Sequence, residues 1–343
     1  MRRFVVLALL CALAAPAAAA RSKSAATDTT ALGRLRAEAA ALRPLAASPL
    51  GQAFLEATSL LPRVTTRVVW RDSARTGAWT DAEVRAYPDS VRARLVRREL
   101  DESYYWNTRY GSPLAYLRAL EILAGHGLGD VRGRRIADFG CGMIGQLRLL
   151  ALLGADATGI DVDPVLRALY NQPGDQGEVR GAKGAKGRVR LLVGQWPTEA
   201  AIRDGVGDGY DLFLSKNTLK NGYLHPAAEV DPRQLVHLGV GDTAYVAELF
   251  RVLRPGGRVL IYNLCPAPAP PGKPYIPWAD GRCPFSEAMW VAAGFKIEAY
   301  NVDDGPAARA MGHALGWDRG EGAMDLEHDL FATWSLFAKP GGP

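Results

Sequence analysis

From residue 135 onward, short apolar runs alternate with segments whose apolar residues recur at helical spacing. The runs lie near residues 135–139, 157–161, 189–193, 210–215, 258–263, 295–302 and 328–337. Alternating strands and helices predict a parallel sheet with helices on both faces. No long crossover helix is evident between the last two runs, so we expect those two to form an antiparallel pair at one edge.

The residues before this pattern predict helices. Residues 31–61 place Leu32, Leu35 and Ala39 near a helical period, with Pro44 and Pro49 as interruptions. A hydroxyl cap at residue 80 precedes an acid three residues later, helical patterning continues through residues 91–100, and a further helix is expected within residues 109–127. We therefore expect a helical N-terminal cap over residues 21–130 and one larger domain over residues 131–339.

Two segments interrupt the alternation. Residues 172–187 are rich in glycine and charge and carry Gly-Ala-Lys twice, which predicts a mobile loop. Residues 266–277 contain six prolines and predict an extended or irregular loop.

The first twenty residues have the pattern of an export signal. Arg2 and Arg3 precede an apolar run over residues 4–14, and the alanines at 18–20 offer a cleavage site before Arg21. We expect residues 1–20 to be a signal peptide and the protein to be periplasmic or secreted. The alternative is an uncleaved N-terminus that anchors the protein to the membrane.

Composition narrows the function class. Hydrophobic residues make up 48% and charged residues 22% of the 343 residues, which is typical of a globular protein. Without Arg2 and Arg3 the formal charge of +5 falls to +3, too little to indicate a nucleic-acid partner. Cys265 and Cys283 either pair or remain two free thiols, and no residues have metal-ligand spacing, so no metal is expected.

The strongest chemical signal is the glycine loop at residues 138–145, Asp-Phe-Gly-Cys-Gly-Met-Ile-Gly. Gly140 permits a tight turn after the first strand, and Gly142 lets the backbone approach a ligand beside Cys141. The following helix directs free N–H groups at the same space. Asp161, at the end of the second strand and followed by Val162, lies 21 residues after Gly140 and is placed to accept hydrogen bonds from ribose hydroxyls.

Nicotinamide dehydrogenases share this spacing, so the distinction depends on other residues. Asp138 lies just before the loop, where it could orient a ligand's ammonium group. Two later segments follow in order: Leu-Phe-Arg-Val-Leu-Arg-Pro-Gly-Gly-Arg-Val-Leu-Ile at residues 249–261 and Ala-Gly-Phe-Lys-Ile at residues 293–297.

Residues 135–339 resemble the class I S-adenosylmethionine-dependent methyltransferases. The resemblance implies a Rossmann-like, doubly wound α/β fold with a seven-stranded sheet, mostly parallel, whose last strand is antiparallel. It also implies that the cofactor S-adenosylmethionine binds across the ends of the first, second and fourth strands. The residues it implies at the cofactor are Asp138, Gly140, Cys141, Gly142, Asp161, Val162, Gln195, Trp196, Ser215 and Lys216.

The chain departs from the family pattern at two positions. Ile144 stands where a third glycine is common, with Gly145 one place late. Gln195 stands where an acid is frequent, although an amide can also hydrogen-bond adenine. The first departure affects the pocket for the methionine part, and the second affects the adenine contact.

The methyl acceptor is expected at residues 215–226, after the fourth strand. Asn217 could orient an acceptor there, and Tyr223 or His225 could take its proton; the alternative is that His225 is a loop residue and Tyr223 packs on the core. The segment lacks the Asn-Pro-Pro-aromatic run that marks planar-nitrogen substrates in the family, which favours a small-molecule acceptor.

Two further segments are candidate walls of the site. Residues 102–110 hold four aromatic residues, which either line a pocket or pack between cap and sheet. Residues 266–278 form either a lid or a surface linker.

The sequence thus predicts a methyltransferase of a small-molecule acceptor. The alternative is an exported, methyltransferase-like domain that is a non-catalytic binding or structural module, because S-adenosylmethionine is made in the cytosol.

Overall fold

The computed structural model describes residues 28–342. The predicted signal peptide lies outside the described residues. Within them, no helix combines the length and the apolar character needed to cross a bilayer.

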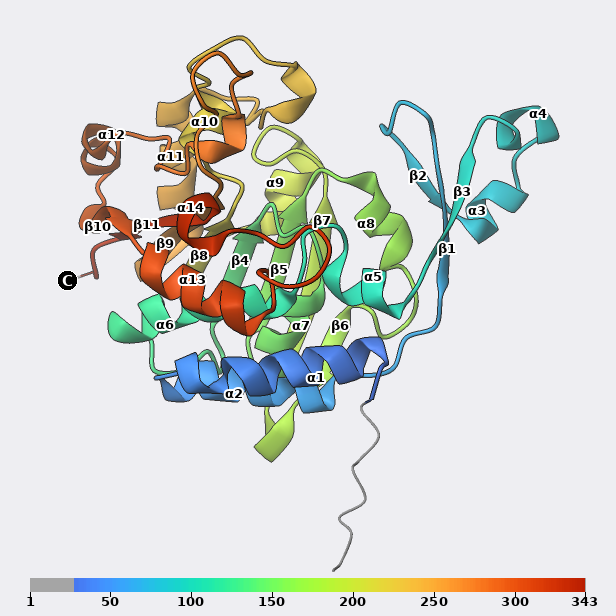
Figure 1. Cartoon of the computed structure of the whole chain (residues 1–343), viewed down its shortest axis with the longest axis horizontal. Helices are drawn as coiled ribbons and strands as arrows, with labels where there is room; N and C mark the ends of the chain where they lie inside the picture. The colour runs from blue at the N-terminus through green and yellow to red at the C-terminus, as the bar shows by residue number, and fades with distance from the viewer. Residues whose placement is uncertain (1–27, 343) are drawn as a thin grey trace, which may run out of the picture.

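The centre of the molecule is one eight-stranded sheet (Figure 1). Its strands are β4 (Arg135–Phe139), β5 (Asp156–Asp161), β6 (Gly177–Arg180), β7 (Lys186–Val193), β8 (Tyr210–Lys216), β9 (Leu253–Cys265), β10 (Lys296–Asp303) and β11 (Phe331–Ala338). Their spatial order is β10-β11-β9-β8-β4-β5-β7-β6. The strands from β9 to β7 are parallel, and β11 is antiparallel to both of its neighbours. The predicted seven-stranded sheet with an antiparallel last strand is confirmed, and β6 adds an eighth strand antiparallel to β7.

Alternate residues of each strand enter one of two hydrophobic cores. Along β4, Ile136 belongs to one core, and Ala137 and Phe139 belong to the other. The first core is covered by α6 (Leu117–Gly125), α7 (Gly145–Leu152), α8 (Pro164–Leu169) and α13 (Gly305–Ala314). The second is covered by α9 (Ala200–Val206), α11 (Asp242–Val252) and α12 (Glu287–Ala292). The predicted arrangement of helices on both faces is confirmed.

Short helices complete the chain. They are α5 (Glu102–Asn107), α10 (Asn221–Leu224), α14 (Leu326–Asp329) and the 3-10 turns η3 (Pro113–Tyr116), η4 (Ala182–Gly184), η5 (Pro232–Gln234) and η6 (Pro277–Ala279). The proline-rich residues 266–276 are irregular, as predicted.

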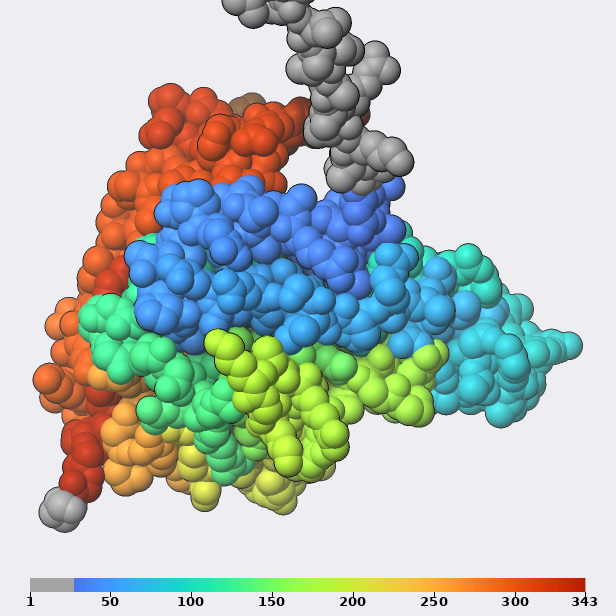
Figure 2. Space-filling model, turned by 90° about the horizontal axis from the view of Figure 1, so that it is seen from below, coloured from blue at the N-terminus to red at the C-terminus, as the bar shows by residue number. Residues whose placement is uncertain are grey.

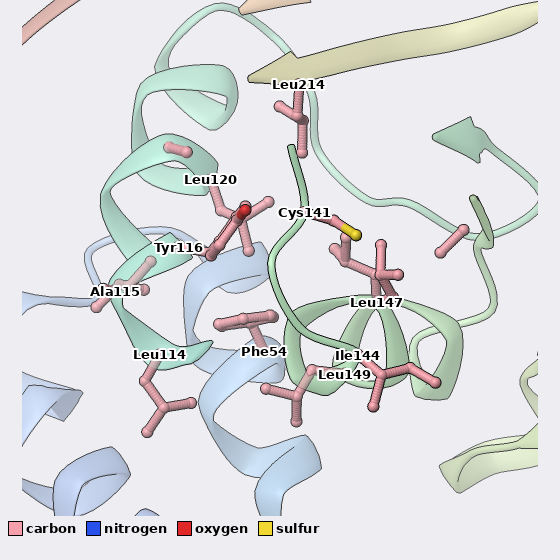
Figure 3. Close-up of a cluster of buried hydrophobic side chains, with 14 of the residues drawn as sticks. Phe54, Leu114, Ala115, Tyr116, Leu120, Cys141, Ile144, Leu147, Leu149 and Leu214 are labelled. Carbon is pink, nitrogen blue, oxygen red and sulfur yellow. The ribbon is translucent and has the colours of Figure 1, made fainter. Parts of the chain in front are cut away.

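The N-terminal region contains the predicted helices and a small sheet that the pattern did not predict. The helices are α1 (Ala31–Leu42), η1 (Arg43–Leu45), α2 (Pro49–Glu56) and η2 (Ala57–Leu60). They lie across one side of the molecule (Figure 2). Phe54 of α2 is fully buried in the same core as Ile144 and Leu149 (Figure 3). These helices therefore share a core with the main sheet.

The small sheet forms an arm at the side of the molecule (Figure 1). It consists of β1 (Arg67–Arg71), β2 (Ala78–Thr80) and β3 (Val96–Leu100), with α3 (Asp81–Arg85) and α4 (Asp89–Arg92) between β2 and β3. The capping box of Thr80 and Glu83 is confirmed at the start of α3. The expected helix through residues 91–100 is wrong, because five of these residues pair with β1 along its whole length. The exposed arginines of β3 carry no alternating pattern that would have indicated a strand.

Two further expectations are corrected. Residues 172–187 are not a mobile loop, because they contain β6 and the start of β7, paired from Gly177 to Val189. The last two strands do form the expected antiparallel pair at one edge of the sheet, with β10 outermost, but helices α13 and α14 connect them.

Candidate functional site

A cavity of about 590 Å³ opens where the carboxyl ends of β4, β5 and β8 meet. This is the edge at which open α/β sheets bind ligands. The cavity brings together most of the residues predicted from the sequence. They are Gly140, Cys141, Asp161, Val162, Gln195, Trp196, Lys216, Asn217 and Tyr223.

The glycine loop uses both of its predicted glycines in left-handed backbone. Gly140 has φ +69° and Gly142 has φ +64°, conformations that side chains rarely adopt. A Cβ at Gly140 would lie 2.0 Å from Thr218 Oγ1, and one at Gly142 would lie 2.5 Å from the ring of Tyr110. Gly142 is thus covered by Tyr110 and does not line the cavity, whereas Gly140 does.

Ile144, which replaces the family's third glycine, is a core residue. Its side chain is fully buried beside Phe54 and Leu149 (Figure 3). Its backbone N–H donates to the hydroxyl of Tyr170 at 3.3 Å, and that hydroxyl donates to the carbonyl of Tyr105 at 2.8 Å. The departure therefore serves packing between the loop and the N-terminal helices.

Asp161 holds the loop and faces the cavity at the same time. Its Oδ2 accepts from the N–H of Gly142 at 2.8 Å, and its Oδ1 accepts from the N–H of Asp163 at 2.9 Å. Burial raises its pKa above the usual value. Each carboxylate oxygen has more than one acceptor position, so both retain capacity for hydroxyl donors from a ligand.

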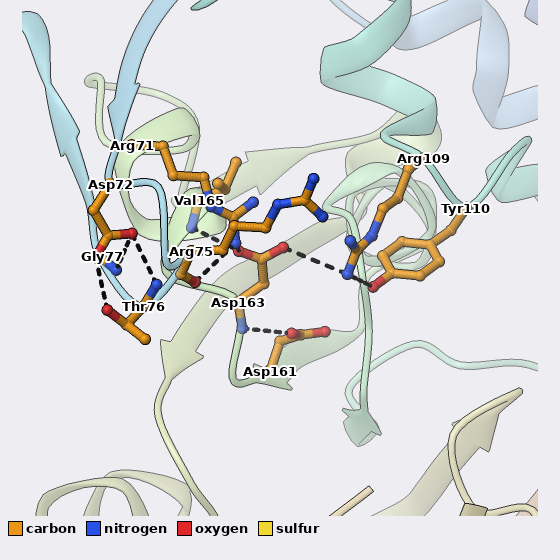
Figure 4. A network of polar contacts seen from close by, with 10 residues as sticks. All are labelled: Arg71, Asp72, Arg75, Thr76, Gly77, Arg109, Tyr110, Asp161, Asp163 and Val165. Atoms are coloured by element: carbon orange, nitrogen blue, oxygen red, sulfur yellow. Dashed lines mark hydrogen bonds and ion pairs between the residues drawn. The ribbon is translucent and has the colours of Figure 1, made fainter. Parts of the chain in front are cut away.

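A polar network beside Asp161 connects three distant segments (Figure 4). Asp163 caps α8 by accepting from the N–H of Val165 at 3.0 Å. It also forms an ion pair with Arg71 of β1 at 3.2 Å and with Arg109 at 3.7 Å. Arg109 in turn donates to the hydroxyl of Tyr110 at 2.6 Å. The arm and residues 109–110 therefore position the rim of the cavity, an arrangement that local sequence patterns could not indicate.

Asp138 is not among the residues that line the cavity, and its contact with a ligand stays a prediction. Its side chain is 0% exposed, and its Oδ2 accepts from Gln146 Nε2 at 2.8 Å. The same amide nitrogen donates to the carbonyl of Cys141 at 2.9 Å. Burial raises the pKa of Asp138 to about 6. Asp138 acts through Gln146 on the glycine loop, and its Oδ1 has no hydrogen-bond partner among the described residues.

Ser215 is also buried away from the cavity. Its side chain accepts from the N–H of Leu219 at 3.2 Å, which closes the turn after β8. Trp196 lines the cavity but belongs mainly to the second core, where it packs on Phe139 and Tyr245. Gln195 donates to the carbonyl of His237 at 2.9 Å.

The three predicted acceptor residues have different positions. Asn217 and Tyr223 line the cavity, and His225 does not. Asn217 has left-handed backbone at φ +65°, and its Oδ1 accepts from the N–H of Leu264 at 2.7 Å. His225 is exposed and lies 3.0 Å from Asp242. The structure therefore brings Asn217 and Tyr223, but not His225, to the cavity.

Lys216 ends β8 and directs its side chain to the sheet face that Asp138 also occupies. Its Nζ lies 5.3 Å from the centre of the Tyr116 ring. Burial, together with the neighbouring Lys220, lowers the pKa of Lys216 to about 8. Tyr116 also lines the cavity, although the sequence did not single it out.

The candidate walls are confirmed only in part. Of the four aromatic residues at 102–110, Tyr110 lines the cavity, whereas Tyr105 and Trp106 are buried in the first core. Trp278 lines the cavity beyond the proline-rich loop, and residues 233–237 form a further wall that the sequence did not indicate.

Among residues 28–342 the cysteines are Cys141, Cys265 and Cys283, and all three are buried, free thiols. Cys265 and Cys283 are therefore two free thiols rather than a disulfide. Across residues 28–342, no group of three or more His, Cys, Asp or Glu residues is placed to hold a metal ion.

Comparisons with known proteins give only weak similarities. No protein-family model matches the chain. No curated protein matches it at a significant level. Three similar solved structures are the 4+2 cyclase SpnF, phosphoethanolamine N-methyltransferase 2 of Haemonchus contortus, and a TehB-like S-adenosylmethionine-dependent methyltransferase of Corynebacterium glutamicum.

Their sequence identities are 20%, 14% and 19%, and their TM-scores are 0.38, 0.40 and 0.31, respectively. The matches cover 66%, 85% and 66% of this chain and 81%, 75% and 97% of the other chains. The sheet topology of the chain itself is Rossmann-like, which is the fold expected from its resemblance to the class I S-adenosylmethionine-dependent methyltransferases.

Proposed function

We propose that the chain binds S-adenosylmethionine and transfers its methyl group to a small-molecule acceptor. The observation that carries this proposal is the position of Asp161. Its carboxylate lies at the end of the second strand, lines the cavity and holds the glycine loop through Gly142. This is where a carboxylate can accept the hydroxyl hydrogen bonds of a ribose.

The residues present fit the nucleoside part of this cofactor. Asp161 has free acceptor positions for the ribose, and Val162 and Ile160 offer apolar surface beside it. Val162 is 66% exposed, which leaves that surface open to a ligand. A cavity of about 590 Å³ lies within the usual range of small-molecule sites, about 300–1,000 Å³.

Two features argue against a dinucleotide. A dinucleotide-binding sheet has six parallel strands in two equivalent halves. Here β11, which lies beyond β9, is antiparallel. A pyrophosphate would also need free N–H groups at the start of α7. The N–H of Ile144, at this helix start, instead donates to Tyr170.

When bound, the cofactor would supply an electrophilic methyl group on a sulfonium sulfur. The protein's main task is then to align an acceptor with that group. Asn217 and Tyr223 line the cavity beyond the end of β8, which supports an acceptor position there. Burial raises the pKa of Tyr223. Its phenol therefore stays protonated at neutral pH, which suits hydrogen-bond donation to the acceptor better than proton removal.

The test is transfer of the methyl group itself. Purified protein is incubated with methyl-labelled S-adenosylmethionine and a panel of small alcohols, amines, thiols and carboxylic acids. Label in any product, lost in Asp161→Ala, supports the proposal. The control variant is Asp130→Ala, which removes an exposed carboxylate that does not line the cavity.

The second candidate is a non-catalytic binding module with the same ligand. The packing of Tyr110 over Gly142 and of Thr218 against Gly140 favours it, because both restrict space beside the glycine loop. It predicts that purified protein retains a bound nucleoside, detected by mass spectrometry, without any methylated product.

We also propose that residues 1–20 direct export and that residues 21–130 and 131–339 form the cap region and the main domain. The charged, apolar and small-residue order of the N-terminus supports export. N-terminal sequencing of the mature protein tests it: a start near Arg21 supports cleavage, and an intact Met1 supports the anchored alternative.

A further inference from the structure

The charged side chains that line the cavity are mainly cationic. Among the described residues that line it, Asp161 is the only carboxylate, whereas Arg109, Lys216 and Arg233 carry cationic side chains. The proposed function assigns Asp161 to the ribose. Asp161 is then engaged by the ligand, so a partner for each of these cations must come from another residue or from the ligand itself.

Two of these cations already have acidic partners. Arg109 pairs with Asp163 at 3.7 Å, and Arg233 pairs with Asp231 through its exposed guanidinium. Lys216 differs from both. Its ammonium has neither a hydrogen bond nor an ion pair with any of residues 28–342, and its one polar contact is the face of the Tyr116 ring at 5.3 Å.

Lys220, four residues later, shows how the chain satisfies a lysine that serves structure. Its Nζ donates to the carbonyls of Leu264 at 2.5 Å and Trp278 at 3.2 Å. These bonds tie the turn after β8 to β9 and to η6. Lys216 has no such role, although it lies at the end of the strand that faces the acceptor.

A half-buried ammonium without a counterion is unfavourable, because desolvation penalises the charged form. The lowered pKa of Lys216, about 8, reflects this burial and the neighbouring Lys220. Asp138 lies on the same sheet face and favours the charged form, but it is more than an ion-pair distance away. An anionic group in the cavity would complete the site and also offset the positive charge of a sulfonium ligand.

We infer that Lys216 binds a carboxylate or similar oxyanion of a ligand in this cavity. Resting on the proposed function, the inference allows two sources for that oxyanion. It belongs either to the methyl acceptor, which would then be an organic acid, or to the amino-acid part of S-adenosylmethionine.

The first experiment separates these sources by calorimetry. S-adenosylhomocysteine carries the amino-acid part, and 5′-methylthioadenosine lacks it. If the cofactor supplies the anion, Lys216→Met lowers the affinity for S-adenosylhomocysteine about tenfold or more, which is the usual effect of losing one charged hydrogen bond. The affinity for methylthioadenosine then stays unchanged. Lys296→Met is the matched control, since Lys296 is an exposed lysine on the edge strand β10. This variant should bind both ligands with the affinity of the wild type.

The second experiment tests the acceptor as the source. The melting temperature of the S-adenosylhomocysteine complex is measured with benzoate, benzamide or inorganic phosphate. If the acceptor supplies the anion, benzoate or phosphate raises the melting temperature and benzamide does not. Lys216→Met abolishes this rise, and Lys216→Arg, which keeps the charge but cannot act as a base, retains part of it.

The inference is overturned if Lys216→Met matches the wild type in both nucleoside affinities and in the anion-dependent melting temperatures. It is also overturned if Lys216→Met melts well below the wild type without ligand, because that result assigns Lys216 a structural role. If the wild type binds neither nucleoside, the proposed function fails by itself. A phosphate-dependent rise that is lost in Lys216→Met would still support anion binding.

Discussion

Asp138→Asn tests the placement of Asp138 beneath the glycine loop rather than in the cavity. The side chain is fully buried and accepts one hydrogen bond from Gln146. Asparagine has nearly the same shape, and its amide oxygen can accept that bond. The substitution therefore removes the negative charge and keeps the connection from Asp138 through Gln146 to Cys141.

The size of the effect follows from the pKa. Burial raises the pKa of Asp138 from 3.8 to about 6. Between these values the folded protein holds a proton that the unfolded chain has released, so the free energy of unfolding falls as pH rises through this window. At about 1.4 kcal/mol per pKa unit, the full penalty at neutral pH is about 3 kcal/mol. About half of it develops between pH 5.0 and pH 7.5.

Urea denaturation of both proteins at pH 5.0 and 7.5 measures this change directly. We expect the stability of Asp138→Asn relative to the wild type to increase by about 1.5 kcal/mol from pH 5.0 to pH 7.5, because all other titrating groups cancel in the comparison. An equal difference at both pH values would refute the raised pKa. A large loss of S-adenosylhomocysteine affinity in the variant would refute the placement, since it would mean that Asp138 contacts the ligand.

Three further substitutions test other parts of the site. Gly140→Ala should destabilise the protein well beyond the about 1–2 kcal/mol expected for Gly127→Ala in urea denaturation, because both have positive φ but only Gly140 has a neighbour, Thr218, within 4 Å. Equal losses would show that the loop has room. Tyr170→Phe should lower the free energy of unfolding by about 1–3 kcal/mol in the same assay, because the N–H of Ile144 loses its hydrogen-bond partner. An unchanged urea midpoint would contradict this. His225→Ala should leave nucleoside affinity unchanged in calorimetry, and a clear loss would place this residue at the ligand after all.

The sequence predicted the parts of the fold that depend on residues close together along the chain. The order of strand, glycine turn, helix and second strand is a local pattern, and it located Gly140 and Asp161 in the cavity correctly. The eighth strand and the arm were missed because they depend on pairing between distant segments. Val96 to Leu100, for example, form a strand only through their contacts with β1.

The differences at the site have a common physical cause. Asp138 was expected at the ligand because it lies just before the glycine loop, although the alternation along β4 puts its side chain on the same face as Ile136, beneath α7. Arg71, which pairs with Asp163, and Tyr116, which lines the cavity, were missed because both belong to elements that precede the main sheet. No local motif indicates which residues of a preceding segment will fold against a loop.

A calorimetric titration of S-adenosylmethionine and S-adenosylhomocysteine into the purified protein tests whether the chain binds this cofactor. We expect binding in the micromolar range for the wild type and a loss of about tenfold or more in Asp161→Ala. Absence of binding by both nucleosides to the folded wild-type protein would contradict the proposed function. An Asp161→Ala variant with wild-type affinity would show that the ligand lies elsewhere.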